Sequence, residues 1–116
     1  MYDVKKAVVI SGLAEAFMSY DERNDMQTVY KELVKATPTT NPAEYEKRSA
    51  TYWADEIKCP ILIIHSKLDE KVSYNQAEKM VKALEETGKE YKFINYEDDV
   101  HGLHPEDFSI IMEWCQ

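Results

Sequence analysis

A short, uninterrupted apolar run near the middle of the chain constrains the fold more than any other stretch. Residues 61–64 read Ile-Leu-Ile-Ile, and Pro60 stands immediately before them. A run of this kind is typical of a strand buried on both faces, as in a parallel sheet, and proline is tolerated where such a strand begins. The chain then turns polar, and Asp69 follows just beyond the strand. Because functional groups of open α/β sheets gather at the carboxyl ends of strands, Asp69 is the first candidate site residue.

Two further segments predict strands on either side of this one. Residues 4–11 contain the apolar run Ala-Val-Val-Ile and end in a Ser-Gly turn signal. Residues 91–96 alternate and are rich in aromatic side chains. Helical patterns lie between the strands, and this alternation predicts an α/β fold with right-handed crossovers. We therefore expect a three-stranded parallel sheet (about 4–11, 60–65 and 91–96) with helices on both faces.

Helical spacing is present in four segments, whereas residues 13–24 show no clean period. Apolar residues recur at helical spacing over 26–34, and this stripe is expected to face the core. Asn41-Pro42 predicts a helix that runs to about residue 50. A third helix begins with the capping-box pattern Ser73-x-x-Gln76 and ends at Gly88. The last helix follows His104-Pro105. We expect its apolar face to consist of Phe108, Ile111, Met112 and Cys115, broadened by Ile110 and Trp114.

Composition limits the partners and the location of the protein. The chain has 116 residues, with 14 basic and 22 acidic side chains and a net charge of -8. Binding to phosphates needs a basic patch, so no nucleic-acid partner is expected. No apolar stretch approaches the length of a membrane span and the start lacks a signal-sequence pattern, so no membrane partner is expected either. Cys59 and Cys115 do not make a disulfide framework, which favours the cytoplasm.

A histidine occupies the loop that follows the third predicted strand. His101 comes after a polar segment and precedes Gly102, which allows a sharp turn. Neighbouring parallel strands would bring this loop and the loop of Asp69 to the same edge of the sheet. An aspartate there accepts a hydrogen bond from one imidazole nitrogen and leaves the other nitrogen free as a base. Asp69 and His101 are therefore the candidate catalytic pair.

The chain from about residue 4 onward, and most strongly from Arg48, resembles the C-terminal part of an α/β-hydrolase. The similarity is greatest to the prolyl oligopeptidase and dienelactone-hydrolase branches, and it is carried by Arg48-Ser49-Ala50, residues 57–65, Asp69, Val72 and the His101-Gly102 pair. In that family a His-Gly-x-x-Asp-like pattern supplies the triad acid, and a later His-Gly supplies the base. The resemblance implies that Asp69 is the acid and His101 the base of a serine hydrolase, an esterase or peptidase. It implies a small-molecule ester or peptide substrate for the intact relative, and neither cofactor nor metal.

The chain departs from the family pattern in two ways. Ser66 stands where the family usually has glycine. More seriously, the family's nucleophile lies on a G-x-S-x-G elbow, and the only glycines here are Gly12, Gly88 and Gly102. The expected domain is thus a single unit, residues 1–116, equivalent to the C-terminal half of the fold without the half that carries the nucleophile. We expect the isolated chain to be inactive.

Other interpretations remain open at this point. One alternative is that Ser11 replaces the missing nucleophile, although it lacks the elbow. His65 closes a strand, and we expect a packed, hydrogen-bonded residue there rather than a ligand. A metal cluster would draw on Asp98, Asp99, His101 and His104. A flavodoxin-like binding domain would need a Gly-rich phosphate loop, and Ser11-Gly12-Leu13 is a poor one. A non-catalytic module that self-associates or binds a partner half is the main alternative.

The first predicted strand also bears on assembly. In the complete fold this strand would be paired on both sides, and here its outer neighbour is absent from the sequence. An unpaired apolar edge is a template for strand pairing. We therefore expect a homodimer that uses the edge formed by residues 7–10 or the helix surfaces beside it.

Overall fold

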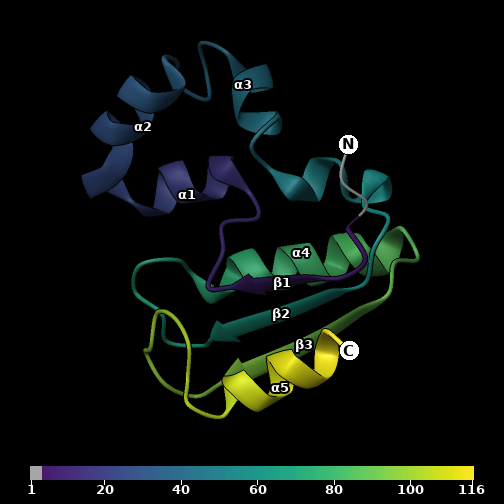
Figure 1. The fold of residues 1–116 in the computed structure, drawn as a ribbon. Helices are drawn as coiled ribbons and strands as arrows, with labels where there is room; N and C mark the ends of the chain where they lie inside the picture. Colours follow the sequence, from purple (N-terminus) through teal and green to yellow (C-terminus); the bar gives the residue numbers. More distant parts are fainter. Residues whose placement is uncertain (1–3) are drawn as a thin grey trace.

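The computed structural model describes residues 4–116, which form a parallel sheet with helices around it (Figure 1). The strands are β1 (Ala7–Ile10), β2 (Ile61–Ser66) and β3 (Tyr91–Tyr96), in the spatial order β1-β2-β3. Ile61 of the central strand lies beside Ala7 on one side and Tyr91 on the other. The predicted α/β fold class with a three-stranded parallel sheet is confirmed.

The first strand is shorter than the predicted 4–11. Backbone pairing with β2 starts at the N–H of Ala7, which donates to the carbonyl of Pro60. Just before it, the Lys6 ammonium donates to the backbone carbonyls of Trp114 and Gln116. Lys6, directly before β1, is thus held by the C-terminal end of the chain rather than by the sheet.

The helices lie on both sides of the sheet. They are α1 (Ala16–Glu22), α2 (Gln27–Val34), α3 (Pro42–Glu46), α4 (Tyr74–Glu86) and α5 (Asp107–Trp114), with short 3-10 turns η1 (Asn24–Met26), η2 (Ala50–Tyr52) and η3 (Ala54–Glu56). Figure 1 shows α4 and α5 on opposite faces of the sheet and α1, α2 and α3 grouped beyond it. None of the helices described over residues 4–116 combines the length and apolar character that crossing a bilayer requires.

The main core lies between the sheet and α4. Alternate side chains of β2, Ile61 and Ile63, pack with the apolar face of α4, which consists of Ala77, Met80 and Leu84. Leu62 and Ile64, which alternate with them along β2, are buried too. They lie on the opposite face of the sheet, the face on which Figure 1 shows α5. Because β2 is covered on both faces, the unbroken apolar run of residues 61–64 was a reliable signal for it.

The structure adds one helix that the sequence pattern did not indicate, and it contradicts two expectations, the end of α3 and the burial of the stripe over 26–34. A helix, α1, occupies part of the stretch that showed no period, and its first turn is fixed by tertiary contacts. The hydroxyl of Ser49 accepts a hydrogen bond from the Ala16 N–H and donates to the Tyr45 carbonyl. Ser49 thereby lies just beyond α3, which ends at Glu46 rather than near residue 50. The apolar stripe of residues 26–34 does not form a core face either, since Leu33 is 73% exposed.

The last helix packs through Ile110, Ile111 and Trp114, which are only part of the predicted apolar face. Phe108 and Met112 are 62% and 67% exposed, and Cys115 is exposed as well. Asp107 is fully buried instead, where it accepts hydrogen bonds from the Tyr96 hydroxyl and the His104 backbone N–H. Apolar residues surround most of α5, so their period could not decide its orientation. The polar contacts of Asp107 decide it.

Candidate active site

The two candidate catalytic side chains meet at the carboxyl edge of the sheet. Asp69 lies in the loop after β2 and His101 in the loop after β3. The Asp69 carboxylate oxygen Oδ2 is 2.9 Å from Nδ1 of His101, as the sequence led us to expect. The Asp69 side chain is fully buried, whereas the His101 side chain is 37% exposed. Within residues 4–116, Nε2 of His101 has no hydrogen-bond partner. The arrangement leaves Nε2 available to take up a proton.

The Asp69 carboxylate is held in place by its own loop. Its second oxygen, Oδ1, accepts hydrogen bonds from the backbone N–H groups of Lys71 at 2.8 Å and Val72 at 2.9 Å. Burial alone would raise the pKa of Asp69, but these N–H donors and His101 together lower the pKa below its ordinary value. Asp69 is therefore ionised at neutral pH, as a group that orients an imidazole must be.

A second residue of the strand end supports the same loop. The His65 ring is buried, and its Nε2 lies 2.7 Å from the carbonyl of Val72. The same nitrogen is 3.7 Å from Oδ2 of Asp69, which is beyond hydrogen-bond distance. The prediction of a packed, hydrogen-bonded histidine is thus confirmed. His65 fixes the loop that carries Asp69 and presents no nitrogen to solvent.

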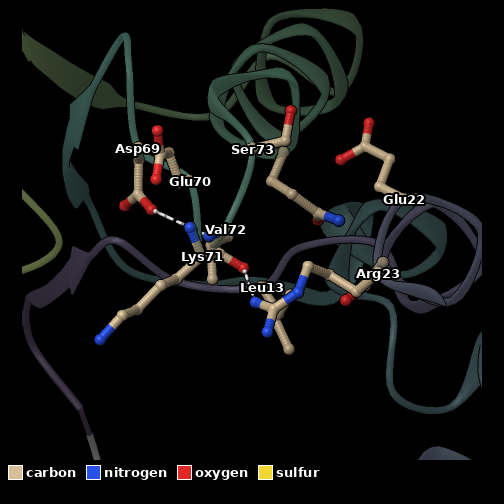
Figure 2. A pocket seen from close by; sticks show the side chains of 10 residues that line it. Leu13, Glu22, Arg23, Asp69, Glu70, Lys71, Val72 and Ser73 are labelled. Atoms are coloured by element: carbon tan, nitrogen blue, oxygen red, sulfur yellow. Dashed lines mark hydrogen bonds between the residues drawn. The ribbon is translucent and has the colours of Figure 1, made fainter. Parts of the chain in front are cut away.

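A small hollow lies beside the acid, between the end of α1 and the loop of Asp69 (Figure 2). Its wall includes Glu22 and Arg23 on one side and residues 69–73 on the other. The Arg23 guanidinium donates to the Lys71 carbonyl at 2.6 Å and pairs with Asp25 at 2.8 Å. Arg23 therefore ties the α1 region to the loop whose N–H groups hold Asp69.

The loop that carries His101 is fastened at the residues that follow it. Immediately after it, the Gly102 N–H donates to the hydroxyl of Ser11 at 3.0 Å. Ser11 lies at the end of β1 and is 6% exposed. Ser11 thus lies next to the loop of His101 and accepts a hydrogen bond from the backbone of that loop.

On the far side of Gly102, a second histidine–carboxylate cluster joins the loop to β3 and α5. Nε2 of His104 lies 2.8 Å from Asp98, and Nδ1 lies 3.5 Å from Asp107. The His104 ring stacks on Tyr96 at a centroid distance of 3.7 Å. Burial lowers the pKa of His104, but the neighbouring carboxylates of Asp98, Asp107 and Glu106 outweigh burial and raise the pKa. The carboxylates around His104 therefore stabilise the protonated form of its imidazole.

Sequence reasoning missed the role of Asp107. The available signal was its spacing, three residues after His104 at the start of a predicted helix, where a carboxylate can accept the N–H of the capping residue. The two loop histidines pair with different carboxylates: His101 contacts Asp69, and His104 contacts Asp98. Within residues 4–116, no group of three or more His, Cys, Asp and Glu residues is arranged to hold a metal ion.

Comparison with known proteins assigns the chain to a family. A profile of the prolyl oligopeptidase family, peptidase family S9, matches residues 6–114. The chain belongs to the prolyl oligopeptidase family. The fold and the sequence resemblance inferred above agree with this membership, and the chain is accordingly a segment related to serine peptidases.

Individual relatives show how much of the fold is present. The uncharacterized peptidase YtmA of Bacillus subtilis is 26% identical over 96 residues, which are 83% of this chain and 37% of YtmA. An acylaminoacyl peptidase from Pyrococcus horikoshii superposes with a TM-score of 0.76 and 26% identity, over 84% of this chain and 16% of that one. A puromycin-hydrolyzing peptidase from Mycobacterium tuberculosis has a TM-score of 0.70 and 24% identity, over 85% and 15% of the two chains. The chain therefore spans well under half of the length of these relatives.

Proposed function

We propose that this chain supplies the acid and the base of a serine-peptidase triad, and that the nucleophilic serine comes from sequence outside these 116 residues. The observation that carries the proposal is the 2.9 Å contact between the buried, ionised Asp69 and Nδ1 of the partly exposed His101. In domain terms, residues 1–116 would be the C-terminal half of the fold, without the half that carries the nucleophile elbow. The cytoplasmic location stays a prediction from the cysteine content.

The chemistry follows from which nitrogen is occupied. Asp69 holds the proton on Nδ1, so Nε2 accepts the proton of the serine hydroxyl as its oxygen attacks the carbonyl carbon of an ester or peptide. The bond to the leaving group then breaks, and the leaving group takes that proton from Nε2. An acyl-enzyme remains. A water molecule attacks it in turn, gives a proton to Nε2, and the serine leaves with that proton.

A chimera tests the assignment because it supplies the missing nucleophile. The matched segment of the Pyrococcus horikoshii acylaminoacyl peptidase is replaced by residues 6–114 of this chain. We expect the chimera to hydrolyse an acylated amino-acid anilide and to react with a fluorophosphonate probe. Asp69→Asn should lower kcat by about 10⁴-fold, the usual effect of losing the orienting acid, and His101→Asn by at least as much.

The matched control is Glu70→Gln, which neutralises the exposed carboxylate next to Asp69. We expect this variant to stay within about twofold of the chimera, because its side chain does not contact the imidazole. A folded chimera without activity would contradict the proposal. Equal rates for Asp69→Asn and Glu70→Gln would contradict it as well.

The open edge of β1 favours a second property, association of two copies. Strand β1 pairs with β2 on one side, and within residues 4–116 no strand pairs with its other side. The N–H groups of Ala7 and Ser11 bond to the neighbouring strand's backbone, so those of the alternate residues Val8 and Ile10 point to the open edge. We propose that two chains pair edge to edge in a homodimer with twofold symmetry. A strand from the serine-bearing half would compete for the same edge.

Proline at position 8 tests the homodimer. Val8→Pro removes an N–H that points away from β2 and is tolerated in an edge strand. Light scattering over a dilution series should show a dimer for the parent chain and a monomer for Val8→Pro, whereas the control Val8→Thr should remain dimeric. A folded parent chain that stays monomeric at high micromolar concentration would rule out the homodimer.

A further inference from the structure

Ser11 has a backbone conformation that serine adopts rarely. Within residues 4–116, it and Lys35 are the non-glycine residues with positive φ, at 51° and 62°. In this region the Cβ atom of an L-residue lies too close to the following carbonyl oxygen, and glycine avoids that strain. Strained residues of this kind persist where the surrounding structure requires them, and they cluster at functional sites. The question is what Ser11 provides that glycine would not.

The turn after β1 is tight at this point. The Ser11 N–H makes the last ladder hydrogen bond of β1, to the Ile64 carbonyl at 2.9 Å. A Cβ atom on the next residue, Gly12, would lie 2.6 Å from Cγ1 of Val9, so the turn depends on glycine there. Glycine at position 11 would make the same turn with less strain. What it would remove is the buried hydroxyl.

That hydroxyl has a specific contact with the loop of the base. Oγ of Ser11 accepts a hydrogen bond from the Gly102 N–H at 3.0 Å, across 91 positions of sequence. Gly102 has a φ of 135°, so its N–H is presented by a backbone conformation that other residues rarely adopt. Gly102 also directly follows His101. The contact thus joins the end of one strand to the residue beside the imidazole of the candidate pair.

We propose that Ser11 is a positioning residue, which retains a strained conformation so that its hydroxyl holds the Gly102 N–H and thereby keeps His101 against Asp69. The proposal rests on the proposed role of His101 as the base. It assigns Ser11 the role of an acceptor for the backbone rather than that of a nucleophile, because Oγ is engaged by Gly102 and the residue is 6% exposed.

The experiment uses the 116-residue chain and three variants. Ser11→Gly relieves the strain and removes the hydroxyl, and Ser11→Ala removes the hydroxyl but keeps the strain. Lys35→Gly is the matched control, since it relieves a positive φ at the C-terminal cap of α2. Hydrogen exchange of the Gly102 amide reports on the hydrogen bond, NMR of the His101 ring nitrogens reports on the contact with Asp69, and urea unfolding reports on stability.

We expect the Gly102 amide to exchange about three- to tenfold faster in both Ser11 variants, as loss of an ordinary hydrogen bond implies. The His101 Nδ1–H signal should broaden in both. The urea midpoint of Ser11→Gly should equal or exceed that of Ser11→Ala. Lys35→Gly should leave the Gly102 amide and the His101 signal unchanged.

Three results would overturn the proposal. They are an unchanged Gly102 exchange rate in Ser11→Gly, an unchanged His101 signal, and an equal loosening of the loop in Lys35→Gly. None of these measurements uses catalysis. A failure here therefore leaves the chimera test of Asp69 and His101 intact, and a failure of the chimera leaves this test intact.

Discussion

Replacing Gln76 by leucine should destabilise the chain strongly, because this side chain joins α4 to the segment after β1. Gln76 is 1% exposed. Its carbonyl oxygen accepts hydrogen bonds from the backbone N–H groups of Ala14 at 2.9 Å and Glu15 at 2.7 Å. Its amide nitrogen donates to the Glu15 carbonyl at 2.9 Å. All three contacts bridge more than 60 positions of sequence.

The magnitude follows from what the variant leaves without a partner. The Glu15 carbonyl keeps a hydrogen bond from the Ser19 N–H, so the loss falls on the N–H groups of Ala14 and Glu15. A buried polar group left unpaired costs about 1–3 kcal/mol, so the two together cost about 2–6 kcal/mol. That is a large share of a total stability of about 5–15 kcal/mol. With a urea dependence of about 2 kcal/mol per molar, a loss of about 4 kcal/mol lowers the midpoint by roughly 2 M.

Urea unfolding followed by circular dichroism is the assay, with Asn75→Leu as the matched control. Asn75 is the preceding residue of the same helix, and its side chain is exposed. The same kind of change there should alter stability by less than about 0.5 kcal/mol. If Gln76→Leu and Asn75→Leu unfold at the same midpoint, the bridging hydrogen bonds do not contribute what the structure indicates.

Three further predictions concern other parts of the chain. The 116-residue chain alone should not hydrolyse activated esters and should show no fluorophosphonate label on any serine, as mass spectrometry of the treated chain can check. The pKa of His104 is higher in the folded chain than in the unfolded chain, where it is about 6.5. The stability that His104 contributes is therefore fully present below the unfolded pKa and is lost as pH rises through the folded pKa. Urea midpoints from pH 5 to 9 should therefore fall more steeply for the parent chain than for His104→Gln, and parallel curves would contradict the assignment. Gly88→Ala should lower the free energy of unfolding by roughly 1 kcal/mol, because Gly88 has a φ of 68° that alanine adopts with strain. Nothing lies within 4 Å of an added Cβ atom, so the cost is one of backbone conformation alone. An unchanged melting temperature would show that the cap tolerates alanine.

The sheet could be predicted from the sequence because burial on both faces leaves a simple mark. The run of residues 61–64 is apolar without interruption, and β2 is buried throughout. The helices were harder, since their orientation depends on single polar contacts. The hydrogen bonds of Asp107 set the orientation of α5. The spacing of Ser73 and Gln76 suggested a capping box, but the Gln76 side chain bonds to residues 14 and 15 instead. Contacts over such sequence distances leave no local period.

The candidate pair was predictable in part. Asp69 and His101 follow neighbouring parallel strands, so topology alone brings their loops to one edge, and the family resemblance selects these residues among the loop carboxylates and histidines. The supporting contacts were not predictable. The hydrogen bond between the Ser11 hydroxyl and the Gly102 N–H does not follow from sequence spacing, and neither does the contact of His104 with Asp98. Both depend on how the loops fold back in three dimensions.

The central claim is that Asp69 holds His101 with Nε2 free, and NMR of the imidazole nitrogens tests it most directly. In the intact chain at neutral pH, the account predicts that Nδ1 of His101 carries a proton hydrogen-bonded to Asp69 and that Nε2 is unprotonated. In Asp69→Asn this Nδ1–H signal should be lost, while Glu70→Gln should retain it. A His101 ring that carries its proton on Nε2, with the same spectrum in the parent chain and in Asp69→Asn, would contradict the account.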